Sequence, residues 1–123
     1  MSEVDAIGIS ACVEKCLDRI NPSGTVSTHV SFDIDALDPI HAPATGTPVD
    51  AGLSLREGLY IGEEMHRQGI NVSVMDLVEV NPLLGNEKEG KLTAKSGVQI
   101  ISAFMGGYRG GQYPSGYELP KPK

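Results

Sequence analysis

Apolar positions recur along the first 20 residues with the period of an amphipathic helix. Ser2 and Asp5 have the spacing of an N-terminal capping box. The positions that share the apolar face are Val4, Ile7, Ala11, Cys12, Cys16 and Ile20. The segment 21–24 combines Asn, Pro, Ser and Gly, a composition typical of a turn. We therefore expect a helix over residues 1–20.

Two strands and two further helices are predicted after this turn. Val, Thr, Ile and Phe dominate the first strand, and the second strand has a mostly buried pattern. Ser54 and Glu57 form a capping box that opens the second helix. The predicted segments are a strand over 25–35, a loop over 36–53, a helix over 54–68, a strand over 71–80, a helix over 92–105 and an extended tail over 106–123.

The order of these elements predicts the class of fold. A strand, a crossover helix and a second strand form a right-handed parallel unit. The chain is therefore expected to be an α/β protein. In such sheets, ligands bind beyond the carboxyl ends of the strands.

Composition narrows the class of function. Of the 123 residues, 40% are hydrophobic and 21% are charged, which is typical of a globular chain. The formal net charge of -6 argues against a nucleic-acid partner, because such binding needs clustered Lys and Arg. No apolar run approaches the roughly 20 residues that span a bilayer, and the first residues lack a secretory pattern. We expect a cytoplasmic protein with no nucleic-acid or membrane partner.

The two cysteines, Cys12 and Cys16, lie four positions apart on the first predicted helix. A structural zinc site needs four ligands, and no second Cys/His pair lies nearby. A disulfide within one helix has poor geometry. We expect both cysteines to be reduced packing residues.

Three carboxylates are predicted at the same edge of the sheet. Asp33 and Asp35 end the first strand, where a period of two places both side chains on one face. Glu79 ends the second strand, so a parallel arrangement brings it to the same edge. Such acids repel one another unless a cation lies between them. The alternative is that the aspartates only cap a turn, as we expect of Asp38.

Two other binding motifs, a calcium loop and a phosphate loop, do not match the sequence of this segment. A calcium loop starting at Asp33 needs an acid or amide at 37, Gly at 38 and Glu at 44, where the chain has Leu37, Asp38 and Ala44. The run over 44–48 has no Lys and opens no helix directly, so it does not predict a phosphate loop.

A longer pattern resembles a known family. Residues 31–39, SFDIDALDP, resemble the S-F-D-x-D-x-x-D-P signature of the ureohydrolases. The pattern continues in APATGTP over 42–48, GL over 52–53, REG over 56–58 and EVNP over 79–82. Residues 1–9 are similar to the helix that precedes this strand in arginases, and the likeness thins out after Gly90. The EVNP run, followed by Leu84 and Gly85, resembles arginase more than agmatinase.

The resemblance implies a fold and a set of roles. The fold would be the C-terminal part of the three-layer, parallel-sheet arginase/deacetylase architecture. Asp33 would bridge two manganese ions and Asp35 would bind one of them. Thr47 and Glu79 would face the guanidinium of L-arginine, since a carboxylate pairs with its planar fork. In this family a metal-bridging hydroxide attacks the guanidinium carbon, and the products are urea and L-ornithine.

The same resemblance implies oligomer contacts. Arg56, Glu57 and Arg109 match positions that make subunit contacts in arginase trimers. A helix cap at Glu57 and a solvated Arg56 are equally good interpretations of these two residues.

The chain also departs from the family. The remaining manganese ligands would be two His and two Asp, one group in a D-x-H-x-D motif, which this sequence lacks. His29, His41 and His66 match no family ligand, and we expect them to be structural or solvent-facing. The family's proton-shuttle His is also missing, so no catalytic residue is assigned.

These departures predict an incomplete active site. We expect arginase sequence that is weakly active or inactive by itself. The alternatives are an agmatinase or other ureohydrolase, and a non-catalytic fragment or assembly module. A mitochondrial location would follow if a targeting segment preceded the chain.

Overall fold

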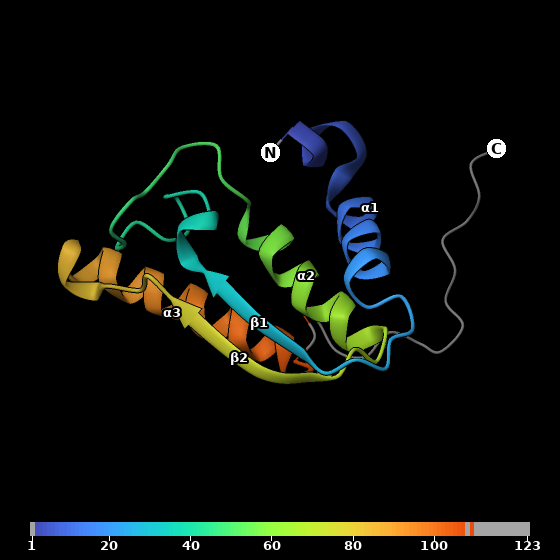
Figure 1. The fold of residues 1–123 in the computed structure, drawn as a ribbon. Coiled ribbons are helices and arrows are strands. Elements are labelled where there is room, and N and C mark those ends of the chain that lie inside the picture. Colours follow the sequence, from blue (N-terminus) through green and yellow to red (C-terminus); the bar gives the residue numbers. More distant parts are fainter. Residues whose placement is uncertain (1, 108, 110–123) are drawn as a thin grey trace.

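The computed structural model describes residues 2–107 and 109, in which helices alternate with parallel strands (Figure 1). In chain order the elements are α1 (Ser2–Ile20), β1 (Thr28–Asp33), the 3-10 helix η1 (Ile34–Ala36), α2 (Leu55–Arg67), β2 (Val72–Val78), the 3-10 helix η2 (Pro82–Leu84) and α3 (Glu87–Phe104). Strands β1 and β2 pair in parallel, with α2 as the crossover between them. The α/β class expected from the sequence is therefore confirmed.

Several elements differ from the sequence-based expectation. Gly8 has φ 77° and ψ 159°, so α1 is broken into two helical pieces. The third helix begins at Glu87 and not at residue 92, because Asn86 and Glu89 form a capping box that the sequence interpretation placed in a loop. Strand β1 ends at Asp33, because the chain turns there into η1. The tail predicted over 106–123 lies outside the described residues except for 106, 107 and 109.

The two faces of the sheet differ in what covers them. The covered face includes Phe32, which is buried and makes an edge-to-face contact with Phe104 at 6.2 Å between ring centroids. The opposite face carries His29, Ser31 and Val74, all exposed. The mostly buried pattern predicted for the second strand is therefore wrong, since Val74 is 52% exposed.

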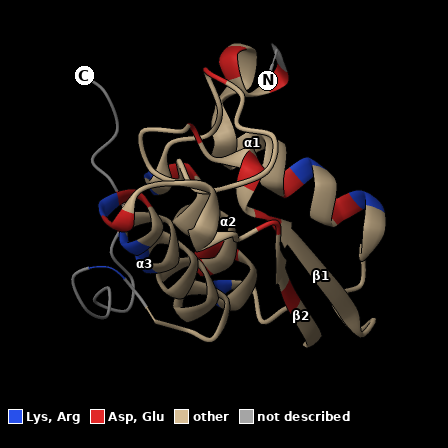
Figure 2. Ribbon diagram, turned by 90° about the vertical axis from the view of Figure 1, so that its left-hand side faces the viewer, with Lys and Arg blue, Asp and Glu red and all other residues tan. Residues whose placement is uncertain are grey.

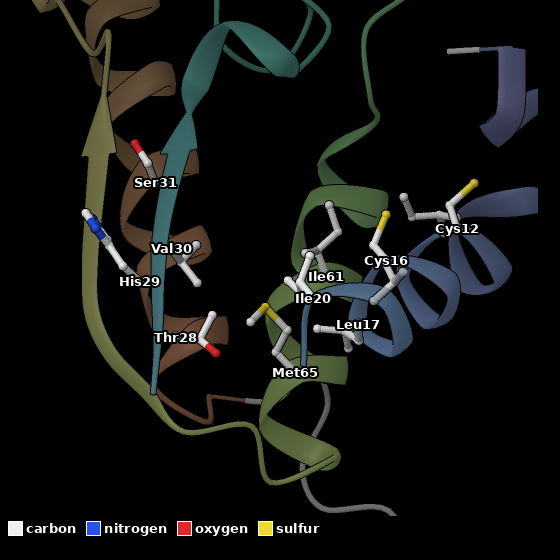
Figure 3. Close-up of a pocket in the computed structure, with 12 residues that line it drawn as sticks. Cys12, Cys16, Leu17, Ile20, Thr28, His29, Val30, Ser31, Ile61 and Met65 are labelled. Carbon is white, nitrogen blue, oxygen red and sulfur yellow. The ribbon is translucent and has the colours of Figure 1, made fainter. Parts of the chain in front are cut away.

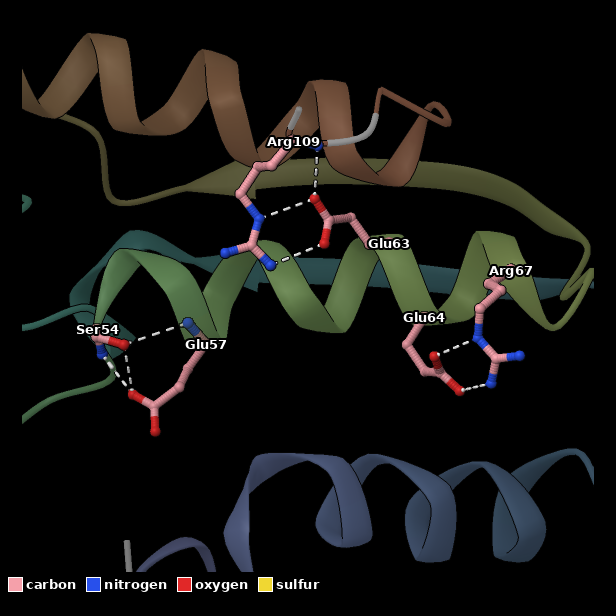
Figure 4. Close-up of polar contacts among 6 residues, drawn as sticks. All are labelled: Ser54, Glu57, Glu63, Glu64, Arg67 and Arg109. Carbon is pink, nitrogen blue, oxygen red and sulfur yellow. Dashed lines mark hydrogen bonds and ion pairs between the residues drawn. The ribbon is translucent and has the colours of Figure 1, made fainter. Parts of the chain in front are cut away.

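The helices lie side by side in the order α3, α2, α1 on the covered face (Figure 4). Close approach of α2 to α3 requires glycine, because a Cβ at Gly62 would lie 2.8 Å from the Phe104 backbone nitrogen. Among the described residues no helix covers the opposite face, so this part of the chain contributes one helical layer and one sheet. Within the same ranges, none of the helices has the length and apolar character needed to cross a bilayer.

Candidate active site

The two aspartates at the end of β1 lie on a turn and not on a continuous strand. Asp33 caps η1, and its Oδ1 accepts a hydrogen bond of 2.9 Å from the backbone nitrogen of Asp35. Asp35 lies within η1, so the period-two geometry expected for the pair is wrong. Ile34 between them is fully buried, which fixes the turn to the core. Figure 2 shows acidic residues, in red, beyond the ends of the strands.

Thr45 connects the end of β1 to the end of β2. Its hydroxyl lies between a carboxylate oxygen of Asp35 and the carbonyl oxygen of Glu79, the latter at 2.8 Å. Because a hydroxyl has one proton, the two acceptors share it. Thr45 is only 4% exposed, so the contact is shielded from water. The hydroxyl of Thr47 donates to the other oxygen of Asp35. The sequence signature contains Thr45, but no role was assigned to it.

Glu79 has a backbone conformation that side chains rarely adopt. Its φ is 63°, in the left-handed region that favours glycine. Two contacts stabilise this turn, namely the Thr45 hydrogen bond and a 3.2 Å bond from the Asn81 nitrogen to the Ala44 oxygen. The carboxylate lies beside Gly46, where a Cβ would be 3.5 Å from Oε2. Strain of this kind concentrates at functional sites.

Two residues within the loop over 36–53, Asp38 and Gly52, fix its conformation. The Asp38 carboxylate accepts hydrogen bonds from the backbone nitrogens of Ile40 at 2.9 Å and Ala51 at 3.0 Å. A Cβ at Gly52 would lie 2.6 Å from the Asp38 nitrogen, so only glycine allows this approach. The two ends of the loop are joined where the Asp38 nitrogen donates to the Leu53 oxygen at 2.8 Å.

Helix α3 holds the loop from the other side. Thr93 is fully buried, and its hydroxyl accepts a 2.9 Å hydrogen bond from the Ala44 nitrogen. Ser96 is buried as well and donates to the His41 carbonyl at 2.7 Å. Polar residues on the inner face of α3 therefore fix the loop that carries Thr45. Their spacing of three along the helix places them on one face, but their partners lie 49 and 55 residues away, so the sequence does not reveal this role.

The described residues do not complete a metal centre. Within them, no group of three or more His, Cys, Asp or Glu side chains converges as ion ligands do. Asp33 and Asp35 offer hard oxygen donors, which suit manganese, but both oxygens of Asp35 contact threonine hydroxyls. The donor chemistry thus fits part of a manganese site, and the number of donors does not fit a whole one.

The residues proposed as subunit contacts are partly engaged within the chain (Figure 4). Glu57 accepts hydrogen bonds from the Ser54 nitrogen and hydroxyl at 2.8 and 2.7 Å. The hydroxyl is the largest cause of the lowered pKa of Glu57. Arg109 pairs with the buried Glu63, at 2.9 Å from Nε and 2.8 Å from Nη2. These bonds lower the pKa of the Glu63 carboxyl, while its burial opposes the shift. Arg56 is exposed on α2.

His29, His66 and the two cysteines lie away from the rim of the sheet, the edge where β1 and β2 end at Asp33 and Val78. His29 pairs with Asp76 at 2.6 Å, and Ser31 donates to the same carboxylate at 2.6 Å. These two bonds lower the pKa of Asp76, with Ser31 as the larger cause. His66 lies against Gly106, where a Cβ would be 2.7 Å from its ring. Cys12 and Cys16 are free thiols.

Comparison with known proteins agrees with the arrangement of these elements. A model of the arginase family matches residues 1–106. The chain belongs to the arginase family. Mitochondrial arginase-2 of Mus musculus is 47% identical over 123 residues, which is 99% of this chain and 34% of the mouse protein.

Solved structures of the family share the fold. An arginase from Bacillus subtilis superimposes with a TM-score of 0.74 at 34% identity, covering 85% of this chain and 34% of that one. A hypothetical agmatinase from Burkholderia thailandensis gives a TM-score of 0.70 at 31% identity, covering 83% and 30%. This arginase-family chain therefore spans about a third of the length of the relatives that it matches.

Proposed function

We propose that this chain supplies part of the active site of an arginase, which hydrolyses L-arginine to L-ornithine and urea. The observation that supports this most directly is the position of Thr45 between Asp35 and Glu79. That contact joins the ends of both strands and the loop at one rim of the sheet. The carboxylates of Asp33 and Asp35 suit a divalent cation, and the carboxylate of Glu79, beside Gly46, suits a positively charged substrate group.

Each side chain at the rim has a separate role in this proposal. Asp33 and Asp35 are two of the ligands of a site for two manganese ions. When bound, the ions would supply a water molecule activated for attack on the guanidinium carbon. Glu79 pairs with the guanidinium and orients its carbon toward the metal ligands. Thr47, whose hydroxyl contacts Asp35, borders the same substrate group.

The isolated chain is expected to produce negligible urea. Two carboxylates leave most positions empty in the shells of two manganese ions, which take about six ligands each. Measurable manganese-dependent hydrolysis of L-arginine by the purified 123-residue chain would contradict this expectation.

A covalent chimera tests the function. This chain replaces the third of mouse arginase-2 that it matches, and the release of urea from L-arginine is measured with and without manganese. The proposal predicts manganese-dependent activity. Glu79→Gln should lower kcat/KM at least about tenfold, because a charged hydrogen bond to the substrate is lost. Glu87→Gln, an exposed acid on α3, is the matched control and should leave kcat/KM unchanged. A chimera that folds and binds manganese without forming urea would overturn the proposal.

The same chimera separates arginase from agmatinase activity. The likeness to the hypothetical agmatinase keeps agmatine as a second candidate substrate. If the chimera hydrolysed agmatine in preference to L-arginine, the substrate-facing residues of this chain would be those of an agmatinase.

Assembly and location belong to the same proposal. We infer a homotrimer for the complete enzyme, with Arg56 and Glu57 at the subunit contact and Arg109 reaching it from its pairing with Glu63. We place the enzyme in the cytoplasm, or in mitochondria as the name of the mouse relative states for that protein. The mass of the chimera in solution tests the first inference, and the location of a tagged protein tests the second.

A further inference from the structure

The direction of the Asp35 carboxylate is not set by strand β1. The side chains of β1 alternate between its two faces, and Figure 3 shows Val30 pointing toward α2 while His29 and Ser31 point the other way. This alternation ends at Asp33, because the chain turns there into η1. Hydrogen bonds from other segments must therefore fix the direction in which the Asp35 carboxylate points.

Two threonine hydroxyls of the loop over 36–53 supply those hydrogen bonds. The Thr45 hydroxyl contacts Oδ1 of Asp35, and the Thr47 hydroxyl contacts Oδ2. Each carboxylate oxygen offers about two lone-pair positions, so one position on each oxygen stays available to a cation. Thr47 is exposed, and water can replace its hydroxyl if that is removed. Thr45 is 4% exposed, so water cannot take the place of its hydroxyl.

The hydroxyl of Thr45 also holds the backbone of Glu79. It lies 2.8 Å from the Glu79 carbonyl oxygen, at a residue whose φ is 63°. A residue other than glycine keeps such a conformation only where the surrounding structure imposes it. The backbone conformation of Glu79 decides the direction in which its side chain leaves the chain. One hydroxyl therefore influences two carboxylates that follow different strands.

Thr45 is held in place through the residue before it. The Ala44 nitrogen donates to the buried hydroxyl of Thr93 on α3 at 2.9 Å, and the Ala44 oxygen accepts from the Asn81 nitrogen at 3.2 Å. Ala44 is itself fully buried. The core of the protein thus fixes the Thr45 hydroxyl, and such preorganisation is what a positioning residue requires.

We propose that Thr45 is a positioning residue of the arginase site. Its hydroxyl orients the metal-ligating carboxylate of Asp35 and the substrate-facing carboxylate of Glu79, and Thr45 touches neither the ions nor the substrate. This inference rests on the proposed function, which assigns the two carboxylates, and adds the residue that links them. Removing a hydrogen-bond partner of a metal ligand costs about 10- to 100-fold in metal affinity or activity.

The test uses the covalent chimera with mouse arginase-2, well below the melting temperature of each variant. Thr45→Val keeps the shape of the side chain and removes the hydroxyl, whereas Thr45→Ser keeps the hydroxyl and removes a buried methyl group. Manganese affinity is measured by calorimetric titration, and KM for L-arginine is measured at saturating manganese. Thr45→Val should weaken manganese binding and raise KM, each by about tenfold or more. Thr45→Ser should bind manganese and L-arginine as the parent chimera does.

A purely structural role for Thr45 predicts the opposite order of the two variants. Loss of the buried methyl group would then make Thr45→Ser at least as harmful as Thr45→Val. Thr25→Val makes the same chemical change in an exposed turn and should leave manganese affinity and KM unchanged. The inference is overturned if Thr45→Val binds both ligands as tightly as the parent, or if Thr45→Ser is impaired as much as Thr45→Val.

A second variant covers the case in which Thr45→Val does not fold. Thr45→Ala removes the hydroxyl without placing a methyl group against the two oxygens, and the comparison with Thr45→Ser then decides in the same way. Failure of the proposed function gives a different result, since the parent chimera would bind manganese without forming urea. Manganese affinity of the Thr45 variants would still report on the contact with Asp35. An active parent with an unimpaired Thr45→Val keeps the function and overturns this inference.

Discussion

At the scale of single residues, Thr45 has the most specific task. Its buried hydroxyl is the link between Asp35 and the Glu79 carbonyl. Thr45→Val keeps the shape and removes the hydroxyl, so we expect a loss of about 1 kcal/mol in the free energy of unfolding. Urea denaturation measures it. Thr25→Val is the control, since Thr25 bonds to Ser23 in an exposed turn. Equal losses in the two variants would show that Thr45 has no special role.

Glu63 provides the residue-scale prediction for pH. Arg109 lowers its pKa below the ordinary value of 4.5, so the folded state holds its charge more readily than the unfolded state. The stabilisation is therefore present above pH 4.5 and is lost as the pH falls through the folded pKa. Glu63→Gln should be less stable than the parent at pH 7 and should lose less stability on acidification. Thermal melts between pH 7 and 3 measure this.

The control for that prediction is Glu14→Gln, an exposed acid on α1. The melting temperature of Glu14→Gln should equal that of the parent chain at every pH. If the melting temperature of Glu63→Gln also equalled that of the parent at every pH, the pair with Arg109 would contribute nothing to folding.

At the scale of elements, the start of α3 is set by a local motif. The side chain of Asn86 accepts hydrogen bonds from the nitrogens of Lys88 and Glu89 at 3.0 and 3.1 Å. Asn86→Ala should lower the free energy of unfolding by about 1 kcal/mol, since these donors lose their partner. Asn71→Ala, at an exposed position before β2, should have a smaller effect. The two values come from denaturant titrations. If Asn86→Ala left the free energy of unfolding unchanged, the helix would begin later in the chain, at about residue 92 as predicted from the sequence.

Several short motifs predicted the structure correctly, although the capping box of Asn86 and Glu89 was missed. The capping box at Ser54 and Glu57 and the alternation of strand and helix are both present. Properties that depend on distant contacts were missed. The turn of Asp35 into η1 depends on Ile34 reaching the core, and the exposed side of β2 depends on what lies opposite it. Thr93 and Ser96 act on a loop that is 49 and 55 residues away in the sequence, so no local pattern shows their role.

At the scale of the whole molecule, the described chain leaves apolar surface uncovered. Each strand of the two-stranded sheet has one unpaired edge in the described part. On α3 the apolar residues Val98, Ile101 and Met105 are 64%, 38% and 66% exposed and follow one another at helical spacing. Unpaired edges and apolar patches favour association. We therefore expect the chain expressed alone to be poorly soluble or oligomeric.

Light scattering coupled to size-exclusion chromatography tests that prediction by measuring the molar mass of the chain in solution. Adding the complementary part of mouse arginase-2 should convert the oligomer to a defined complex, while an unrelated protein of equal size should not. A monodisperse monomer with a sharp cooperative melt would contradict the prediction.

The left-handed backbone at Glu79 has a consequence for engineering this chain. A non-glycine residue at φ 63° carries strain of about 1 kcal/mol. Glu79→Gly relieves that strain and removes the acid proposed to hold the guanidinium. Selecting variants only for a higher melting temperature would therefore favour the loss of the carboxylate that the chemistry needs.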